Sequence, residues 1–241
     1  MDKQRTMTKD EVMAQLAKLG SAQTKKTFLR HGAVEPLYGV KVGDLKTIQK
    51  KLKKNYELSL ELYNTGNSDA MYLAGLIADE NKMSKKDLNH WAKKSAWHMI
   101  SEYTVAQLTA ETKHGWELAL EWIESKEERV AASGWSTLSN IVSITADDEL
   151  DLAYLEKLMK RVEKEIHTAP NRVRYTMNGF ILSVGCYVVP LSEKARQAAV
   201  RIGTVNVNVG DTACKVPQVV EYMNKVIAMK RLGKKRKEAR C

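Results

Sequence analysis

The sequence predicts an all-α protein, a solenoid assembled from antiparallel helix pairs. Its 241 residues contain only four prolines, at positions 36, 170, 190 and 217, and these lie far apart. The stretches between them are rich in Ala, Leu, Lys, Glu and Met, which favour helices over other structures. Phe occurs twice, and Val and Ile do not form the alternating runs that are typical of half-buried strands. These observations argue against a large sheet.

The helices can be placed in order along the chain. Thr8–Glu11 has the form of a capping box, with Thr8 at the N-cap and Glu11 reaching back, and Gly20 ends this first helix. A second helix covers about 21–30, and after a turn Asp44 can cap a third. Further amphipathic helices are expected at about 57–64, 69–79, 85–100, 104–110, 115–124, 127–143, 147–166, 171–189, 192–202 and 217–231.

Pairs of these helices recur about every 35–45 residues, which is the range of HEAT and armadillo repeats. We therefore expect a single domain over 1–228, a HEAT-like or armadillo-type right-handed superhelix, followed by a basic tail at 229–241. No crisp consensus repeats, so a non-repetitive helical bundle is the alternative. A solenoid would offer a long concave face, which suits an extended partner such as a nucleic-acid duplex.

The charge of the chain is strongly positive and unevenly distributed. The net charge is +10, and the segment from Lys230 to Arg240 holds seven Lys or Arg and one Glu, a net of +6, which leaves +4 for the rest. A basic tail is typical of proteins with a polyanionic partner, although it can also serve only to keep the protein soluble.

Several classes of function are poorly supported. The three cysteines, Cys186, Cys214 and Cys241, are widely spaced and read as reduced thiols of a cytoplasmic protein. The five histidines lack metal-ligand spacing, and no Walker A or G-x-G-x-x-G motif occurs. No apolar run is long enough to span a bilayer, and the N-terminus is not a signal peptide. We expect a monomer without metal, cofactor or membrane contact.

An aromatic and basic cluster lies between Trp91 and Tyr103. Lys93 and Lys94 stand between Trp91 and Trp97. Rings stack on bases while ammonium groups neutralise phosphates, so this cluster is a candidate nucleic-acid contact. Alternatively, Trp97 belongs to the core and the lysines form a solvated face.

A second candidate follows Pro170. Arg172 and Arg174 lie in the first turn of a helix, where the dipole opposes cations. Their position indicates a nearby anion, either a protein carboxylate or a phosphate held jointly with helix N–H groups. Arg174 and Asn178 are four residues apart and share one helix face.

A third candidate is the segment Val209–Pro217. Gly210 and Asp211 mark a tight turn. Lys215 could lower the pKa of the Cys214 thiol and make it nucleophilic. No histidine lies nearby in the sequence, so we expect Cys214 to be a buried structural cysteine, with an enzyme using Cys214 or Asp211 as the alternative.

Four segments in order resemble the DNA alkylation repair family, the AlkD-like, HEAT-like-repeat DNA glycosylases. Residues 31–46 resemble its G-V-x-x-P-x-x-G-V-x-x-x-x-L-R signature, and Ser95–Ser101 resembles its S-W-W-D-x-V-D segment. Residues 128–140 resemble the mid-chain helix that follows, and Val173–Phe180 matches the V-R-K-A-I-N-W-A helix. The similarity spans about residues 10–200.

The resemblance implies a basic concave groove for duplex DNA and, in the glycosylases of the family, excision of N-alkylated purines. Tryptophans and a carboxylate would face the lesion and stabilise the developing sugar cation. Trp97 stands at a family tryptophan position, whereas the catalytic aspartate of the family falls on Ser101. A basic position of the family falls near Ala131 or Ala132, and another tryptophan position falls on Gly179. Glu102 could replace the aspartate only if the helix were rotated, because neighbours point about 100° apart.

These considerations predict a DNA-binding protein of this family, with base excision as a further activity that depends on the altered catalytic positions. The catalytic candidates are Trp97, Ser101 and Glu102. The nucleic-acid-binding candidates are Lys93, Lys94, His98, Trp135, Arg172, Arg174, Asn178 and Lys215. The alternative is a non-enzymatic scaffold that binds structured nucleic acid or protein on the same face.

Overall fold

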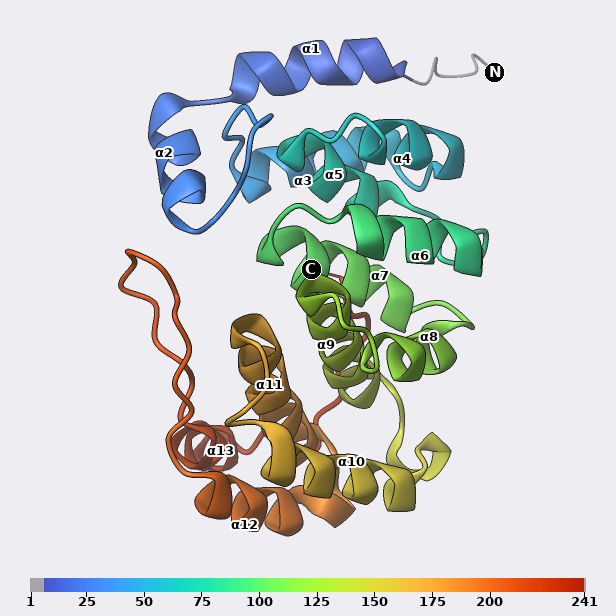
Figure 1. The fold of residues 1–241 in the computed structure, drawn as a ribbon. Coiled ribbons are helices and arrows are strands. Elements are labelled where there is room, and N and C mark those ends of the chain that lie inside the picture. The colour runs from blue at the N-terminus through green and yellow to red at the C-terminus, as the bar shows by residue number, and fades with distance from the viewer. Residues whose placement is uncertain (1–6, 241) are drawn as a thin grey trace.

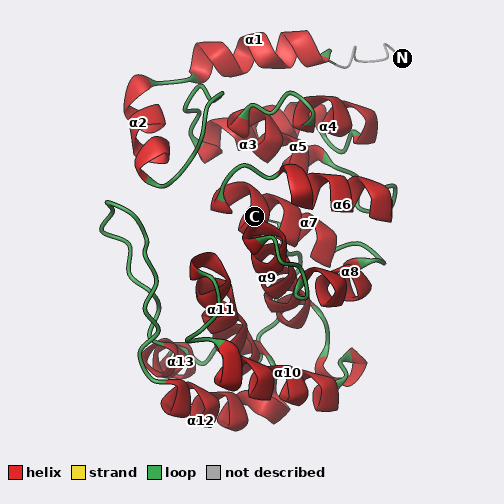
Figure 2. Cartoon of the chain, in the orientation of Figure 1, coloured by secondary structure: helices red, strands yellow, loops and turns green. Residues whose placement is uncertain are grey.

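Helices joined by short connections make up the structure, a computed structural model that describes residues 7–240 and has no strand in that range (Figure 2). The first half comprises α1 (Lys9–Leu19), α2 (Ala22–Arg30), α3 (Val42–Leu52), α4 (Tyr56–Tyr63), α5 (Ser68–Ile77), α6 (Lys85–Lys94), the π-helix η1 (Met99–Val105), α7 (Ala106–Ala110) and α8 (Gly115–Trp122). The second half comprises α9 (Glu128–Ile144), the 3₁₀-helix η2 (Asp147–Glu149), α10 (Leu152–Glu165), α11 (Asn171–Tyr187), the 3₁₀-helix η3 (Val189–Leu191), α12 (Ser192–Ile202) and α13 (Val219–Ala228). The all-α prediction is confirmed. Cys241 and residues 1–6, part of the N-terminus expected not to be a signal peptide, lie outside the described residues.

Local sequence signals placed most helix ends to within a few residues. The expected cap at Asp44 is wrong, because α3 begins at Val42 with Lys41 at its N-cap. The capping box of α1 is present, since Thr8 N–H donates to Glu11 Oε2 at 2.8 Å and Glu11 N–H donates to Thr8 Oγ1 at 3.3 Å. The expected continuous helix over 85–100 is wrong. Helix α6 ends at Lys94, and a short turn separates it from η1, which begins at Met99. In this turn the Ser95 hydroxyl donates to the Ala92 carbonyl.

The turn after α2 is held by a buried carboxylate. Asp69 at the start of α5 accepts hydrogen bonds from the backbone N–H groups of Tyr38, Gly39 and Val40. Gly39 has φ +80°, and a Cβ there would lie 2.4 Å from the backbone nitrogen of Lys25. Only glycine fits this position, so the family-like segment 31–46 has a structural role.

Successive helix pairs stack into an arc, with α1 at one end and α12 at the other (Figure 1). Helix α9 packs against α8, α7 and α11, and the inner helices α5, η1, α9 and α11 follow one another along the arc. The seam between the inner and outer layers contains the core, in which Trp91, Trp122 and Trp135 are fully buried. None of the helices in the described range is both long and apolar enough to cross a bilayer.

The basic tail follows the inner layer instead of leaving the protein. Residues 233–240, here called the C-terminal strap, pass the C-terminal ends of α11, α9, α7 and α5 in turn. Their donors reach carbonyl groups in the last turns of three of these helices. The bonds are Gly233 N–H to Cys186 O, Arg236 N–H to Ser143 O, Lys235 Nζ to Val142 O, and Arg240 Nη1 to Gly75 O and Ala78 O.

Ion pairs fix the strap further. Lys235 pairs with Asp147 at 2.8 Å, and Arg240 pairs with Glu80 and Glu111 at 2.6 and 2.7 Å. The last carbonyls of a helix lack intrahelical partners and carry the negative end of its dipole, so cationic donors stabilise them. The sequence suggested a polyanion partner or solubility as the purpose of this charge, and the structure adds the capping of helix ends.

Candidate nucleic-acid interface

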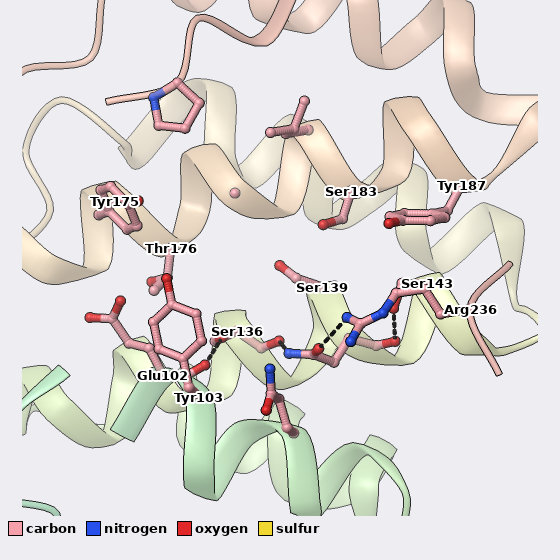
Figure 3. A pocket seen from close by; sticks show the side chains of 15 residues that line it. Glu102, Tyr103, Ser136, Ser139, Ser143, Tyr175, Thr176, Ser183, Tyr187 and Arg236 are labelled. Carbon is pink, nitrogen blue, oxygen red and sulfur yellow. Dashed lines mark hydrogen bonds between the residues drawn. The ribbon is translucent and has the colours of Figure 1, made fainter. Parts of the chain in front are cut away.

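The inner face of the arc contains a cavity of about 280 Å³ between η1, α9 and α11 (Figure 3). Most of its lining side chains are polar. They are Glu102, Tyr103, Gln107, Ser136, Ser139, Asn140, Ser143, Tyr175, Thr176, Gly179, Leu182, Ser183, Tyr187, Pro217 and Arg236. A Cβ at Gly179 would meet no atom within 4 Å, so the position where the family has a tryptophan is open here.

The π-helix decides which residue of the Ser101–Glu102 pair faces the cavity. Ser101 is 1% exposed, its hydroxyl donates to Trp97 O, and its own carbonyl accepts from Ser133 Oγ of α9. Glu102 instead lines the cavity. Placing Ser101 at a catalytic position is therefore wrong, because its side chain is closed into the contact with α9.

Glu102 does not stand alone in the cavity. Its carboxylate accepts two hydrogen bonds from Arg172, from Nε at 2.7 Å and from Nη2 at 2.5 Å, across 70 residues of sequence. The Glu102 side chain is 3% exposed and the Arg172 side chain 21%. Burial raises the pKa of the Glu102 carboxyl, while Arg172 acts in the opposite direction. The pair neutralises the one carboxylate of this cavity.

Of the two anions expected near the cations at the start of α11, a protein carboxylate and a phosphate, the structure supports the carboxylate. Glu102 holds the Arg172 guanidinium, and Glu128 of α9 accepts a hydrogen bond from the Arg172 backbone N–H. Arg172 also lies over the Tyr175 ring, 4.4 Å from its centroid, a typical cation–π contact. Arg174 is partly buried, and its Nε has no hydrogen-bond partner among the described residues.

Two titratable groups beside this pair have shifted pKa values. Burial, together with the positive charge of Arg172, lowers the pKa of His98 to about 4. Burial raises the pKa of Tyr103 to about 12, with contributions from Tyr175 and Glu102. At neutral pH, His98 is an uncharged imidazole and contributes no charge to a phosphate contact.

Both tryptophans expected at the interface belong to the core. Trp135 is 0% exposed and packs on Phe180, so its prediction as a nucleic-acid contact is wrong. Trp97 is 6% exposed and is covered by Phe28 of α2, with ring centroids 5.6 Å apart. Its catalytic assignment fails for the same reason: large apolar rings at helical spacing fill the seam between the layers.

Asn178 fixes a loop instead of facing solvent. It is 5% exposed, and its Nδ2 donates to Pro217 O at 3.0 Å, so its prediction as a nucleic-acid contact is wrong. At the start of α11, Asn171 exchanges two hydrogen bonds with the Asn208 backbone. These bonds hold the loop over residues 203–218 along α11, on the open side of the arc (Figure 1).

The tip of that loop reaches α2. Cys214 Sγ lies 4.0 Å from His31 Nδ1, although 183 residues separate them. Cys214 is exposed, so its prediction as a buried structural cysteine is wrong, while Cys186 is buried and has a pKa raised to about 11. Lys215 is exposed on the same loop.

Lys93 and Lys94 are exposed in the last turn of α6, next to the turn that leads into η1. Arg129 at the start of α9 donates to Ala96 O in that turn. The two lysines therefore lie at the edge of the arc where the inner helices begin, opposite the edge followed by the C-terminal strap.

Sequence reasoning missed the stripe that lines the cavity. Tyr175, Gly179, Ser183 and Tyr187 recur every four residues along α11, and all four line the cavity (Figure 3). Small and polar residues at this spacing on a largely apolar helix were a signal that could have identified the inner face. In the described part of the chain, no three His, Cys, Asp or Glu side chains gather in a metal-binding arrangement.

Comparisons with known proteins agree with this architecture. The family model described as "DNA alkylation repair enzyme" matches residues 12–186. The uncharacterized proteins Lmo0209 of Listeria monocytogenes and Lin0241 of Listeria innocua are 36% and 35% identical over 225 residues, covering 91% of this chain and 97% of each relative.

A solved structure is similar over nearly the whole chain. It is described as "A new family of proteins related to the HEAT-like repeat DNA glycosylases with affinity for branched DNA structures", with a TM-score of 0.90 and 37% identity. The match covers 98% of this chain and 100% of the other. It confirms the predicted HEAT-like solenoid, against a non-repetitive bundle.

Proposed function

Because this chain belongs to the DNA alkylation repair enzyme family, we propose that it binds branched DNA on the inner face of its arc without excising bases. The observation that carries this proposal is the ion pair between Arg172 and Glu102, whose carboxylate lines the cavity. The solved relative with affinity for branched DNA structures supports the choice of ligand.

The electrostatics of the cavity disfavour base excision. A developing sugar cation requires an unpaired negative charge and a water-free contact. Glu102 has both oxygens bonded to Arg172, is 3% exposed, and has no second carboxylate beside it in the cavity lining. The Glu102–Arg172 pair therefore presents little net charge to a sugar.

Exposed cations around the inner face favour DNA binding. Lys93 and Lys94 are exposed at one edge, and Lys215 is exposed on the loop that borders the open side. Such cations neutralise phosphates without reading sequence. A junction offers phosphates from more than two strands, and an arc can contact several arms at once. We propose that one chain binds each junction, in the compartment that holds the DNA.

Fluorescence anisotropy with a labelled three-way junction and a linear duplex of the same arm sequence tests the ligand. The junction should bind at least tenfold more tightly, and log affinity should fall linearly with log salt. Equal affinity for the two DNAs would exclude a preference for branches. Equal affinity for a folded RNA would point to a general scaffold.

A matched pair of variants tests the location. Lys93→Ala combined with Lys94→Ala should weaken junction binding and reduce the salt slope by about two. Lys164→Ala, on the exposed face of the outer helix α10, should change neither quantity. Equal effects of the two changes would place the DNA elsewhere.

A base-release assay tests the absence of excision. Duplexes containing N7-methylguanine or N3-methyladenine, incubated with the native chain, should release no more base than buffer alone. Release that is lost in Glu102→Gln would show that the paired carboxylate still acts in catalysis.

A further inference from the structure

A second cavity lies beside the first, at the C-terminal end of the arc. It has a volume of about 340 Å³ and lies between the end of α11, helix α13 and the chain that follows α13. The two cavities share Leu182, Ser183 and Tyr187 as lining residues, so Tyr187 stands between them. A ligand on the inner face can therefore continue into the second cavity.

The lining of the second cavity combines aromatic rings with cations. Tyr187 and Tyr222 both line it, and Tyr222 is 49% exposed. Three cations, Lys225, Arg231 and Lys234, complete its polar lining, which contains no carboxylate. The second cavity therefore has an excess of positive charge beside two aromatic rings.

These cations differ from those of the C-terminal strap. Lys235 and Arg240 are fixed by Asp147, Glu80 and Glu111. In contrast, Lys225, Arg231 and Lys234 are exposed, and none of them lies within ion-pair distance of a carboxylate in the described part of the chain. Helix capping explains the charges of the strap. The cations of the second cavity, in contrast, have no carboxylate partner among the described residues.

We infer that this cleft binds a single-stranded DNA segment that leaves the branch point. Stacking of bases on exposed rings and neutralisation of the backbone by adjacent cations are the two features of single-strand binding. The volume is at the small end of ligand pockets and suits a nucleotide, not a duplex. The inference rests on the proposed function, since it extends the branched ligand from the inner face past Tyr187, which lines both cavities.

The test compares a fully paired three-way junction with one that carries a flap of about six thymidines at the branch, a length within the range of single-strand sites. The native chain should bind the flapped junction about tenfold more tightly, as expected for a stacked base. Tyr222→Ala should remove this gain and leave binding of the paired junction unchanged. Tyr222→Phe should keep it, because the ring remains.

The outcomes separate this inference from the proposed function. A flap that adds less than twofold, or a gain that survives Tyr222→Ala, overturns the single-strand cleft while junction binding stands. If neither junction binds, the proposed function fails, and oligothymidine alone is titrated at low salt. Binding that depends on Tyr222 then supports the cleft, and its absence overturns it.

A competition separates nucleic acid from protein as the occupant. Oligothymidine should lower the affinity for the flapped junction to that for the paired junction, whereas an acidic peptide of equal charge should not. An equal effect of both would overturn the inference, since it would show a site that selects charge alone. Because Tyr222 is half-exposed, its replacement should leave the thermal unfolding midpoint unchanged.

Discussion

Arg172 and Arg240 are both largely buried against carboxylates, yet they differ in what remains for a ligand. The Arg240 side chain is 11% exposed and pairs with Glu80 and Glu111. Its Nη1 donates to the carbonyls of Gly75 in α5 and of Ala78, the C-cap of that helix. The Arg172 side chain is 21% exposed and pairs with Glu102 alone.

The difference shows how a buried cation can be structural or available. The nitrogens of Arg240 all have partners, so it serves as the end anchor of the strap. In Arg172, Nε and Nη2 are bonded, while Nη1 makes no hydrogen bond to a described residue. Arg172 is partly exposed and therefore keeps a donor that a phosphate can reach.

Breaking the Arg240 anchor should have the largest effect. Arg240→Met leaves Glu111 without its cation, leaves Glu80 with Lys54 alone, and frees the end of the strap, which should cost about 3 kcal/mol of unfolding free energy. Urea unfolding measures this loss. Lys237→Met, an exposed position on the same strap, should change stability by less than about 0.5 kcal/mol. Similar values for both variants would show that the strap is not an anchor.

At Arg172, Glu102→Gln should lower the stability of the protein and raise its affinity for the junction. Loss of the charged partner should cost about 3 kcal/mol, the low end for a buried pair, because Arg172 can still reach water. Junction affinity should rise, and the salt slope should steepen by about one, since one more cation meets phosphate. Glu165→Gln, on the outer layer, is the control. Junction affinity that falls in Glu102→Gln but not in the control would show that Arg172 is not available to a phosphate.

Much of the fold was predictable because its signals are local. The Thr8 capping box and the amphipathic spacing fixed helix positions without reference to distant residues. The segment after Ser95 was not predictable, because its π-helix depends on α9. Ser133 and Ser136 donate to the carbonyls of Ser101 and Glu102, across 32 and 34 residues of sequence.

The candidate site was less predictable, because its chemistry depends on pairing. Arg172 was identified as a cation in need of an anion, but Glu102 lies 70 residues away in the sequence and is brought to it only by the stacking of η1 and α11. Trp97 and Trp135 suit both a core and a base contact, and only their burial decides. Composition does not distinguish a capping lysine from a binding one.

His98, which lies beside Arg172, should make the stability of the folded protein depend on pH. Its folded pKa is about 4, below the ordinary value of 6.5, through burial and the charge of Arg172. The unfolded chain therefore takes up a proton first, and stability is lost as pH falls through 6.5 towards 4. From pH 7 to 5 the loss should be about 2 kcal/mol. His98→Gln should remove this part of the slope in urea unfolding, and an unchanged slope would show that other groups cause it.

The smallest expected effect concerns the loop that borders Arg172 but not Arg240. Asn178→Ala removes the hydrogen bond to Pro217 O, which should cost about 1 kcal/mol. Because this bond holds only the loop over 203–218, hydrogen exchange should accelerate about fivefold at loop amides such as Asn208. The strap amides of Arg236 and Ala239 should keep their native rates. Equal acceleration at both places would mean that the loop and the strap open together, and that the two arginines belong to one cooperative unit rather than two.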